Sequence, residues 1–146
     1  MEVAMIGTKI LLVDDEVIFT KNMNRLLDAR GYQSLSVNGG AEAIRALEKD
    51  AFDVVVLDLK MPGMDGLTTL KEMKKLGLFT QTLILTGHGS IDSALEAVKL
   101  GAYDYLAKPC QIEELVAKIE GAWDNNKDDI QAFKITTDDE HDRPVT

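Results

Sequence analysis

Five short apolar runs, each followed by an amphipathic segment, constrain the fold of this 146-residue chain more than any other feature. The run at residues 53–57 is β-branched and apolar on both faces, which is typical of a central strand covered from both sides. After each run, apolar residues recur at the three- and four-residue spacing of one helix face. We therefore expect strands at residues 9–13, 33–37, 53–57, 82–85 and 103–107, followed by helices around residues 19–27, 41–49, 67–73, 91–98 and 112–123.

The alternation of strand and helix predicts an α/β fold with a parallel sheet and helices on both faces. Because crossover connections between parallel strands are right-handed, few topologies remain. We predict a five-stranded parallel sheet of the flavodoxin-like (βα)5 type, with the strand order 2-1-3-4-5. Periodicity alone does not separate this order from other doubly wound arrangements.

The composition indicates one domain with short flanking segments. We expect an N-terminal extension at residues 1–7, one domain at residues 8–123 and an acidic tail at residues 124–146. The tail holds seven acidic and three basic residues, and we expect it to be partly helical or disordered. A single cysteine excludes an internal disulfide and fits the cytoplasm.

Charge and hydropathy exclude two classes of partner. The net charge is −9 and no basic cluster is present, which argues against direct nucleic-acid binding. No stretch approaches the roughly 20 apolar residues that a membrane span requires. We therefore expect neither a nucleic acid nor a membrane as a direct partner.

Residues with carboxylate, hydroxyl or ammonium groups follow four of the expected strands. Asp14 and Asp15 come after the first strand, Asp58 after the third, Thr86 after the fourth and Lys108 after the fifth. Each feature alone is common in turns and helix caps. Because ligands of open parallel sheets bind at the carboxyl ends of strands, we expect these side chains to meet at one edge.

Three neighbouring carboxylates repel one another unless protons or a cation offset their charge. Oxygen ligands of this kind suit Mg²⁺ or Mn²⁺, which favours attack on a phosphoryl group by neutralising charge. In that setting Asp58 can act as a nucleophile and form an acyl phosphate. Lys108 and Thr86 can contact the phosphoryl oxygens through an ammonium and a hydroxyl group.

Residues 8–123 resemble the receiver domains of response regulators, the CheY-like superfamily. The motifs that carry the resemblance are ILLVDDE at residues 10–16, VVLDLKMPGMDG at residues 55–66, LTGHG at residues 85–89 and GAYDYLAKP at residues 101–109. The last two motifs are most similar to receivers of the nitrogen-regulation, NtrC-like type. Together the four motifs are highly specific for this family.

The resemblance implies a signalling switch of a two-component phosphorelay rather than a conventional enzyme. Asp58 matches the phosphoacceptor, and Asp14, Asp15, Asp58 and the backbone carbonyl of Lys60 match the metal ligands, with Asp15 as the direct ligand of the acidic pair. The phosphoryl group would come from a sensor histidine kinase or a phosphotransfer protein. The domain would promote its own Mg²⁺-dependent phosphorylation and dephosphorylation.

The resemblance also assigns the residues that transmit the signal. Thr86 matches the hydroxyl that moves toward the phosphoryl group, Lys108 matches the lysine that contacts it, and the bond from Lys108 to Pro109 would be cis. Tyr105 matches the aromatic residue that changes rotamer with Thr86, although ordinary half-buried packing remains an alternative. Phosphorylation would reshape the face of the fourth helix, fifth strand and fifth helix, which could bind an output domain or protein or form a homodimer.

Three residues depart from the usual pattern or leave their role open. Lys60 and His88 each lie two residues after a site residue and flank the expected phosphoryl group. Cys110 stands where the family often has phenylalanine, and it can be either a redox switch or a buried inert thiol. The sequence does not indicate the kinase, the output target or the phosphoryl lifetime.

Three rival functions share some of these features. A haloacid-dehalogenase-like phosphohydrolase also uses Asp, Thr, Lys and Mg²⁺, but its nucleophile lies in a DxD pattern. In this chain Lys60 occupies the position of the second Asp, two residues after Asp58. An adaptor that has lost phosphorylation would not need the full residue set. A flavodoxin would need a Ser/Thr/Gly-rich phosphate loop after the first strand, where Asp14 and Asp15 lie.

Overall fold

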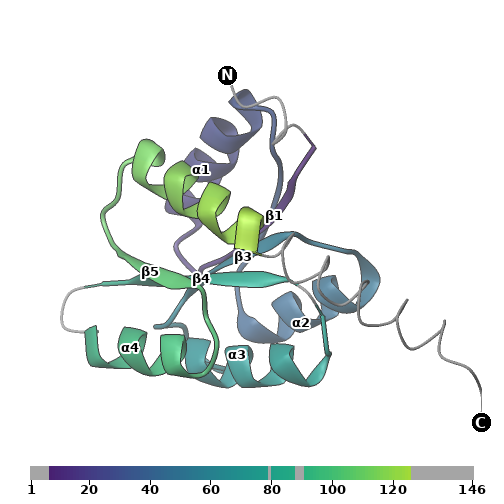
Figure 1. Ribbon diagram of the computed structural model, residues 1–146, viewed down its shortest axis with the longest axis vertical. Coiled ribbons are helices and arrows are strands. Elements are labelled where there is room, and N and C mark those ends of the chain that lie inside the picture. The colour runs from purple at the N-terminus through teal and green to yellow at the C-terminus, as the bar shows by residue number, and fades with distance from the viewer. Residues whose placement is uncertain (1–6, 79, 88–90, 126–146) are drawn as a thin grey trace, which may run out of the picture.

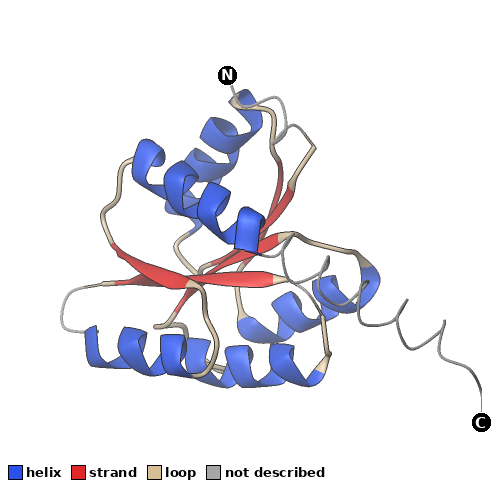
Figure 2. Ribbon diagram, in the orientation of Figure 1, coloured by secondary structure: helices blue, strands red, loops and turns tan. Residues whose placement is uncertain are grey.

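A five-stranded parallel sheet forms the middle layer of the protein in a computed structural model that describes residues 7–78, 80–87 and 91–125 (Figures 1 and 2). The strand order is β2-β1-β3-β4-β5, which confirms the predicted topology. All four neighbouring pairs are parallel, in the arrangement that crossover helices require. The strands are β1 (Lys9–Val13), β2 (Gln33–Val37), β3 (Val54–Asp58), β4 (Gln81–Thr86) and β5 (Asp104–Ala107).

Helices cover both faces of this sheet. One face carries α1 and a C-terminal helix that spans residues 112–125, and the other carries α2, α3 and α4 (Figure 1). Leu27 and Ile119 pack with the side chains that β1, β3 and β4 direct toward the first face, whereas Leu47 and Leu70 pack on the second. The bounds of the remaining helices are α1 (Val17–Ala29), α2 (Gly40–Lys49), α3 (Gly66–Lys75) and α4 (Ile91–Lys99).

Burial along the strands follows their position in the sheet. Every residue of β3 is buried, as the unbroken apolar run predicts for a central strand. The edge strand β2 is only partly covered, and its Leu35 is exposed. Because β1, β3 and β4 are neighbours in the sheet, their carboxyl ends lie next to one another at one edge.

The ends of the chain are only partly described. Residues 124 and 125 belong to the C-terminal helix, whereas residues 1–6 and 126–146 lie outside the described residues. The division into extension, domain and acidic tail therefore stays a prediction. Among the described residues, no helix combines the length and the apolar character that a membrane crossing needs.

Candidate phosphoacceptor site

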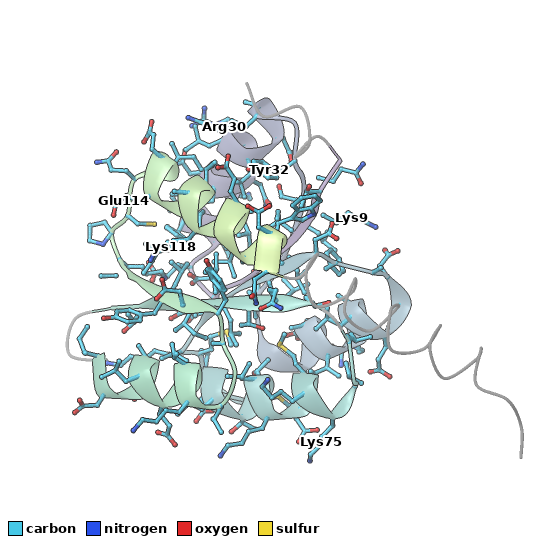
Figure 3. All side chains as sticks on the ribbon, viewed as in Figure 1. Lys9, Arg30, Tyr32, Lys75, Glu114 and Lys118 are labelled. Carbon is cyan, nitrogen blue, oxygen red and sulfur yellow. The ribbon has the colours of Figure 1, made fainter. Side chains whose placement is uncertain are left out.

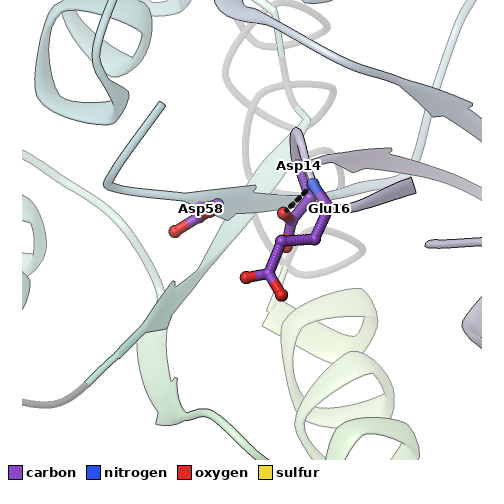
Figure 4. A group of neighbouring side chains, drawn as sticks. All are labelled: Asp14, Glu16 and Asp58. Carbon is purple, nitrogen blue, oxygen red and sulfur yellow. Dashed lines mark hydrogen bonds between the residues drawn. The ribbon is translucent and has the colours of Figure 1, made fainter. Parts of the chain in front are cut away.

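Asp14 lies directly after β1, and its carboxylate is 1% exposed. Its Oδ1 accepts a hydrogen bond from the backbone N–H of Glu16 at 2.9 Å (Figure 4). The backbone N–H of Asp14 donates to the carbonyl of Val37, which extends the pairing of β1 with β2 to the edge of the sheet. These bonds hold the Asp14 carboxylate in a fixed orientation at the end of the central strands.

Asp58 is the last residue of β3 and is 5% exposed. Its Oδ1 accepts a hydrogen bond from the backbone N–H of Lys60 at 3.1 Å. Gly66, at the start of α3, packs against this segment so closely that an added Cβ would lie 2.5 Å from Leu59 Cα and 2.6 Å from the Asp58 carbonyl oxygen. Glycine at position 66 therefore lets α3 approach the loop that follows Asp58.

Lys108 follows β5 and extends across the sheet edge to the two aspartates. Its Nζ lies 2.5 Å from Asp14 Oδ2, 2.7 Å from Glu16 Oε1 and 3.6 Å from Asp58 Oδ2. The same ammonium lies 4.7 Å from the centre of the Phe19 ring, within range of a cation–π contact. The Lys108–Pro109 peptide bond is cis, as expected.

Thr86 and Tyr105 lie beside this group on β4 and β5. Thr86 is buried at the end of β4, and its hydroxyl donates to the carbonyl of Gly87 at 3.2 Å. The Thr86 carbonyl in turn accepts from the backbone N–H of Lys108 at 2.8 Å. Tyr105 is half-buried against the cluster beneath α3 and α4, so its packing is compatible with either interpretation of its role.

The carboxylates that gather at this edge differ from the predicted set in one member. Among the described residues, Asp14, Glu16 and Asp58 form a group whose nearest carboxylate oxygens lie within 4.8 Å of one another (Figure 4). Asp15 is exposed and lies outside this group, so its role as a metal ligand stays a prediction. Glu16 was not among the predicted site residues, although its position directly after the acidic pair was a signal for it.

Burial and like charge oppose ionisation of Asp58. Desolvation raises the pKa of Asp58 from 3.8 to about 6, with a further contribution from the Asp14 carboxylate, against the lowering effects of the Lys60 backbone N–H and the Lys108 ammonium. Burial by itself would lower the pKa of Lys108, but its hydrogen bonds to Asp14 and Glu16 raise that pKa overall. Lys108 is therefore a permanent cation at neutral pH.

The donor set fits a divalent cation. One lysine ammonium faces three carboxylates, so full ionisation leaves excess negative charge at the edge. Carboxylate oxygens are the ligands that Mg²⁺ and Mn²⁺ prefer in proteins. Burial is the main cause of the raised pKa of Asp58, and the neighbouring Asp14 carboxylate adds to it.

The three residues that depart from the usual pattern lie in different surroundings. The Lys60 side chain is exposed, and His88 lies outside the described residues. Cys110 is a half-buried free thiol whose pKa is raised by burial and by the nearby Glu114 carboxylate. A thiol with a raised pKa is less reactive at neutral pH, which favours the inert role over the redox role.

The family model of the response regulator receiver domain matches residues 10–120. The chain belongs to this family. The sporulation initiation phosphotransferase F of Bacillus subtilis (strain 168) is 37% identical over 111 residues, which are 76% of this chain and 90% of that protein. A receiver domain protein from Clostridium thermocellum has a structure that matches with a TM-score of 0.78 and 37% identity, over 82% of this chain and 97% of the other.

The expected similarity to the nitrogen-regulation type is confirmed as well. The DNA-binding transcriptional regulator NtrC of Escherichia coli (strain K12) is 39% identical over 111 residues, which are 76% of this chain but 24% of that protein. The receiver therefore spans about a quarter of the length of such transcriptional regulators. Family membership makes this a signalling domain of two-component phosphorelays and argues against the phosphohydrolase and flavodoxin alternatives.

Proposed function

We propose that this receiver is a phosphoacceptor switch, in which Asp58 takes a phosphoryl group from the phosphohistidine of a sensor histidine kinase or a phosphotransfer protein. The observation that carries the proposal is the meeting of the Asp58 and Asp14 carboxylates with the Lys108 ammonium at one edge of the sheet. An Asp58 oxygen would attack phosphorus while the bond from phosphorus to histidine nitrogen breaks. The product is an acyl phosphate on Asp58.

The residues around Asp58 have separate roles in this proposal. The Lys60 backbone N–H holds Oδ1 of the acceptor carboxylate at 3.1 Å, and the second oxygen, Oδ2, lies 3.6 Å from Lys108 Nζ. Lys108 would pair with one phosphoryl oxygen as a point charge. Thr86 would turn its hydroxyl from the Gly87 carbonyl to another phosphoryl oxygen, because a charged acceptor forms the stronger hydrogen bond.

Mg²⁺ or Mn²⁺ would be held by the carboxylates of Asp14, Asp15 and Asp58 and by the backbone carbonyl of Lys60. When bound, it would supply positive charge that offsets the carboxylates and the incoming phosphoryl group. Asp14 is fixed by its bond from the Glu16 backbone N–H, so it would orient the metal or its water ligands without rearrangement. Exposed Asp15 would complete the set from the solvent side.

The signal would leave through the face formed by α4, β5 and the C-terminal helix. Ile91 and Leu95 on α4 are exposed, which gives this face an apolar component. Lys118 on the C-terminal helix points toward β5, where it forms an ion pair with Asp104 (Figure 3). A phosphoryl group that draws Thr86 toward Asp58 would favour one arrangement of this face, as a bound ligand favours one of two states.

An output domain or protein would read this change, and a homodimer through the same face is a further arrangement. Residues 8–123 would form the folded switch, residues 1–7 an extension and residues 124–146 an acidic tail, in a cytoplasmic protein. The DNA-binding activity in the name of NtrC belongs to a longer protein, of which this chain matches 24%.

Incubation with acetyl phosphate and Mg²⁺ tests the proposal. The wild type should gain one phosphoryl group by intact mass, and Asp58→Asn should gain none. An unlabelled wild type, or equal labelling of Asp58→Asn, would favour the adaptor function instead. Steady hydrolysis of an external phosphate ester at enzymatic rates would favour the phosphohydrolase.

A further inference from the structure

The ammonium of Lys108 lies at unequal distances from three carboxylates and is farthest from that of Asp58. Nζ lies 2.5 Å from Asp14 and 2.7 Å from Glu16, but 3.6 Å from Asp58. The Phe19 ring occupies another side of the ammonium, 4.7 Å from its centre. A phosphoryl oxygen on Asp58 would therefore have to compete for an ammonium whose two shortest contacts are already made to Asp14 and Glu16.

Glu16 is the contact that can be given up most easily. Asp14 is buried and fixed by a backbone hydrogen bond, whereas the Glu16 side chain is 64% exposed. Water competes for the exposed Glu16 carboxylate but much less for the Lys108 side chain, which is 13% exposed, so this contact is weaker than the buried contact to Asp14. A phosphoryl group can therefore replace Glu16 as a partner of Lys108, but the short contact to Glu16 would slow this replacement.

The position of Glu16 at the start of α1 gives a second, independent observation. Glu16 is the N-cap residue of this helix, where Ser, Thr, Asp and Asn are preferred, and its side chain makes no capping hydrogen bond. Only its backbone serves the helix, through a carbonyl that accepts from the Thr20 N–H at 3.1 Å. The carboxylate instead accepts from Lys108, so the side chain serves the site and not the helix.

We propose that Glu16 is a positioning residue that holds Lys108 away from Asp58 and so restrains phosphoryl capture; this inference rests on the phosphoacceptor role proposed above. A phosphoryl group brings new negative charge to Asp58 and competes with Glu16 for the same ammonium. Neutralising Glu16 leaves Lys108 with Asp14 and Asp58 alone. The phosphoryl group then no longer competes with Glu16 for the ammonium.

The test compares Glu16→Gln with the wild type at saturating Mg²⁺, using two small phosphodonors. Labelling should be about two- to fivefold faster with acetyl phosphate, the range expected when one ion pair with an exposed carboxylate is removed. The same factor should appear with phosphoramidate, which carries less negative charge. Binding of beryllofluoride, a stable phosphoryl analogue, should tighten by about the same factor, and the affinity for Mg²⁺ alone should be unchanged.

Glu42→Gln is the matched control, because Glu42 is also an exposed glutamate with a cationic partner, Arg45 at 3.6 Å, on α2. It should leave all of these quantities at wild-type values. Three results would overturn the inference: unchanged labelling of Glu16→Gln, acceleration with acetyl phosphate alone, or slower labelling with weaker Mg²⁺ binding. The second would indicate simple charge repulsion at the entrance, and the third would make Glu16 a metal ligand.

Failure of the proposed function has a different signature. In that case the wild type and Glu16→Gln would both stay unlabelled by either donor, and neither would bind beryllofluoride. A labelled wild type with an unchanged Glu16→Gln variant would leave the phosphoacceptor role intact and remove only the positioning role.

Discussion

Asp58→Asn should stabilise the metal-free protein at neutral and alkaline pH, although it removes the proposed acceptor. Burial raises the pKa of Asp58 from 3.8 to about 6, a shift of about two units. Each unit corresponds to about 1.4 kcal/mol, so the ionised Asp58 costs the folded state up to about 3 kcal/mol. Asparagine keeps an oxygen for the Lys60 N–H, and the pKa of about 6 already includes the attraction of Asp58 to Lys108, so we expect a net gain of about 1–3 kcal/mol.

The sign of the pH dependence follows from the direction of the shift. Because the pKa of Asp58 is higher in the folded state, below about pH 4 the group is protonated in both states and costs nothing. Between about pH 4 and pH 6 the unfolded state loses its proton first, so stability falls as the pH rises. The gain in the free energy of unfolding from Asp58→Asn should therefore be near zero at about pH 4 and complete above about pH 7.

Urea denaturation in EDTA, followed by the fluorescence of the single tryptophan, measures the difference in the free energy of unfolding between Asp58→Asn and the wild type. Trp123 is partly buried against the core, so its emission should change on unfolding. Asp15→Asn is the matched comparison, because it removes an exposed charge next to the site and should change stability much less. Equal stability of Asp58→Asn and the wild type at about pH 8, or the same gain at both pH values, would refute the reasoning.

Three further predictions address the metal, the packing and the output face. Asp15→Ala should abolish Mg²⁺-dependent labelling by acetyl phosphate, and retained labelling would contradict its role as a metal ligand. Gly66→Ala should lower the free energy of unfolding by about 2–3 kcal/mol in urea, because its Cβ would lie 2.5 Å from backbone; an unchanged midpoint would show that α3 can shift freely. Lys118→Ala should change stability by less than about 1 kcal/mol, because its ion pair with Asp104 is partly exposed; a larger loss would give that pair a structural role.

The sequence was sufficient to predict the sheet because its short apolar runs alternate regularly with amphipathic segments. The unbroken run of β3 indicated a central strand, and all of its residues are buried. The order of the strands required the rule of right-handed crossovers together with the choice of a flavodoxin-like arrangement. The ends of helices were less predictable: α1 begins at Val17, two residues before the apolar spacing starts at Phe19.

The candidate site was predictable as a set of strand ends but not as a set of contacts. Asp14, Asp58 and Lys108 meet because the carboxyl ends of neighbouring parallel strands share one edge. The part played by Glu16 depends on the direction in which its side chain leaves the first turn of α1, which spacing does not define. The same limit applies to Asp15, whose exposure could not be read from its place in the acidic pair.

Chemical mapping of the phosphorylated position tests the central claim most directly. After labelling with acetyl phosphate and Mg²⁺, borohydride reduces an acyl phosphate of aspartate to homoserine, and peptide mass spectrometry locates it. We expect this conversion at Asp58 alone. Conversion at Asp14 or Asp15, or phosphate bound stably to a hydroxyl group or a histidine, would contradict it.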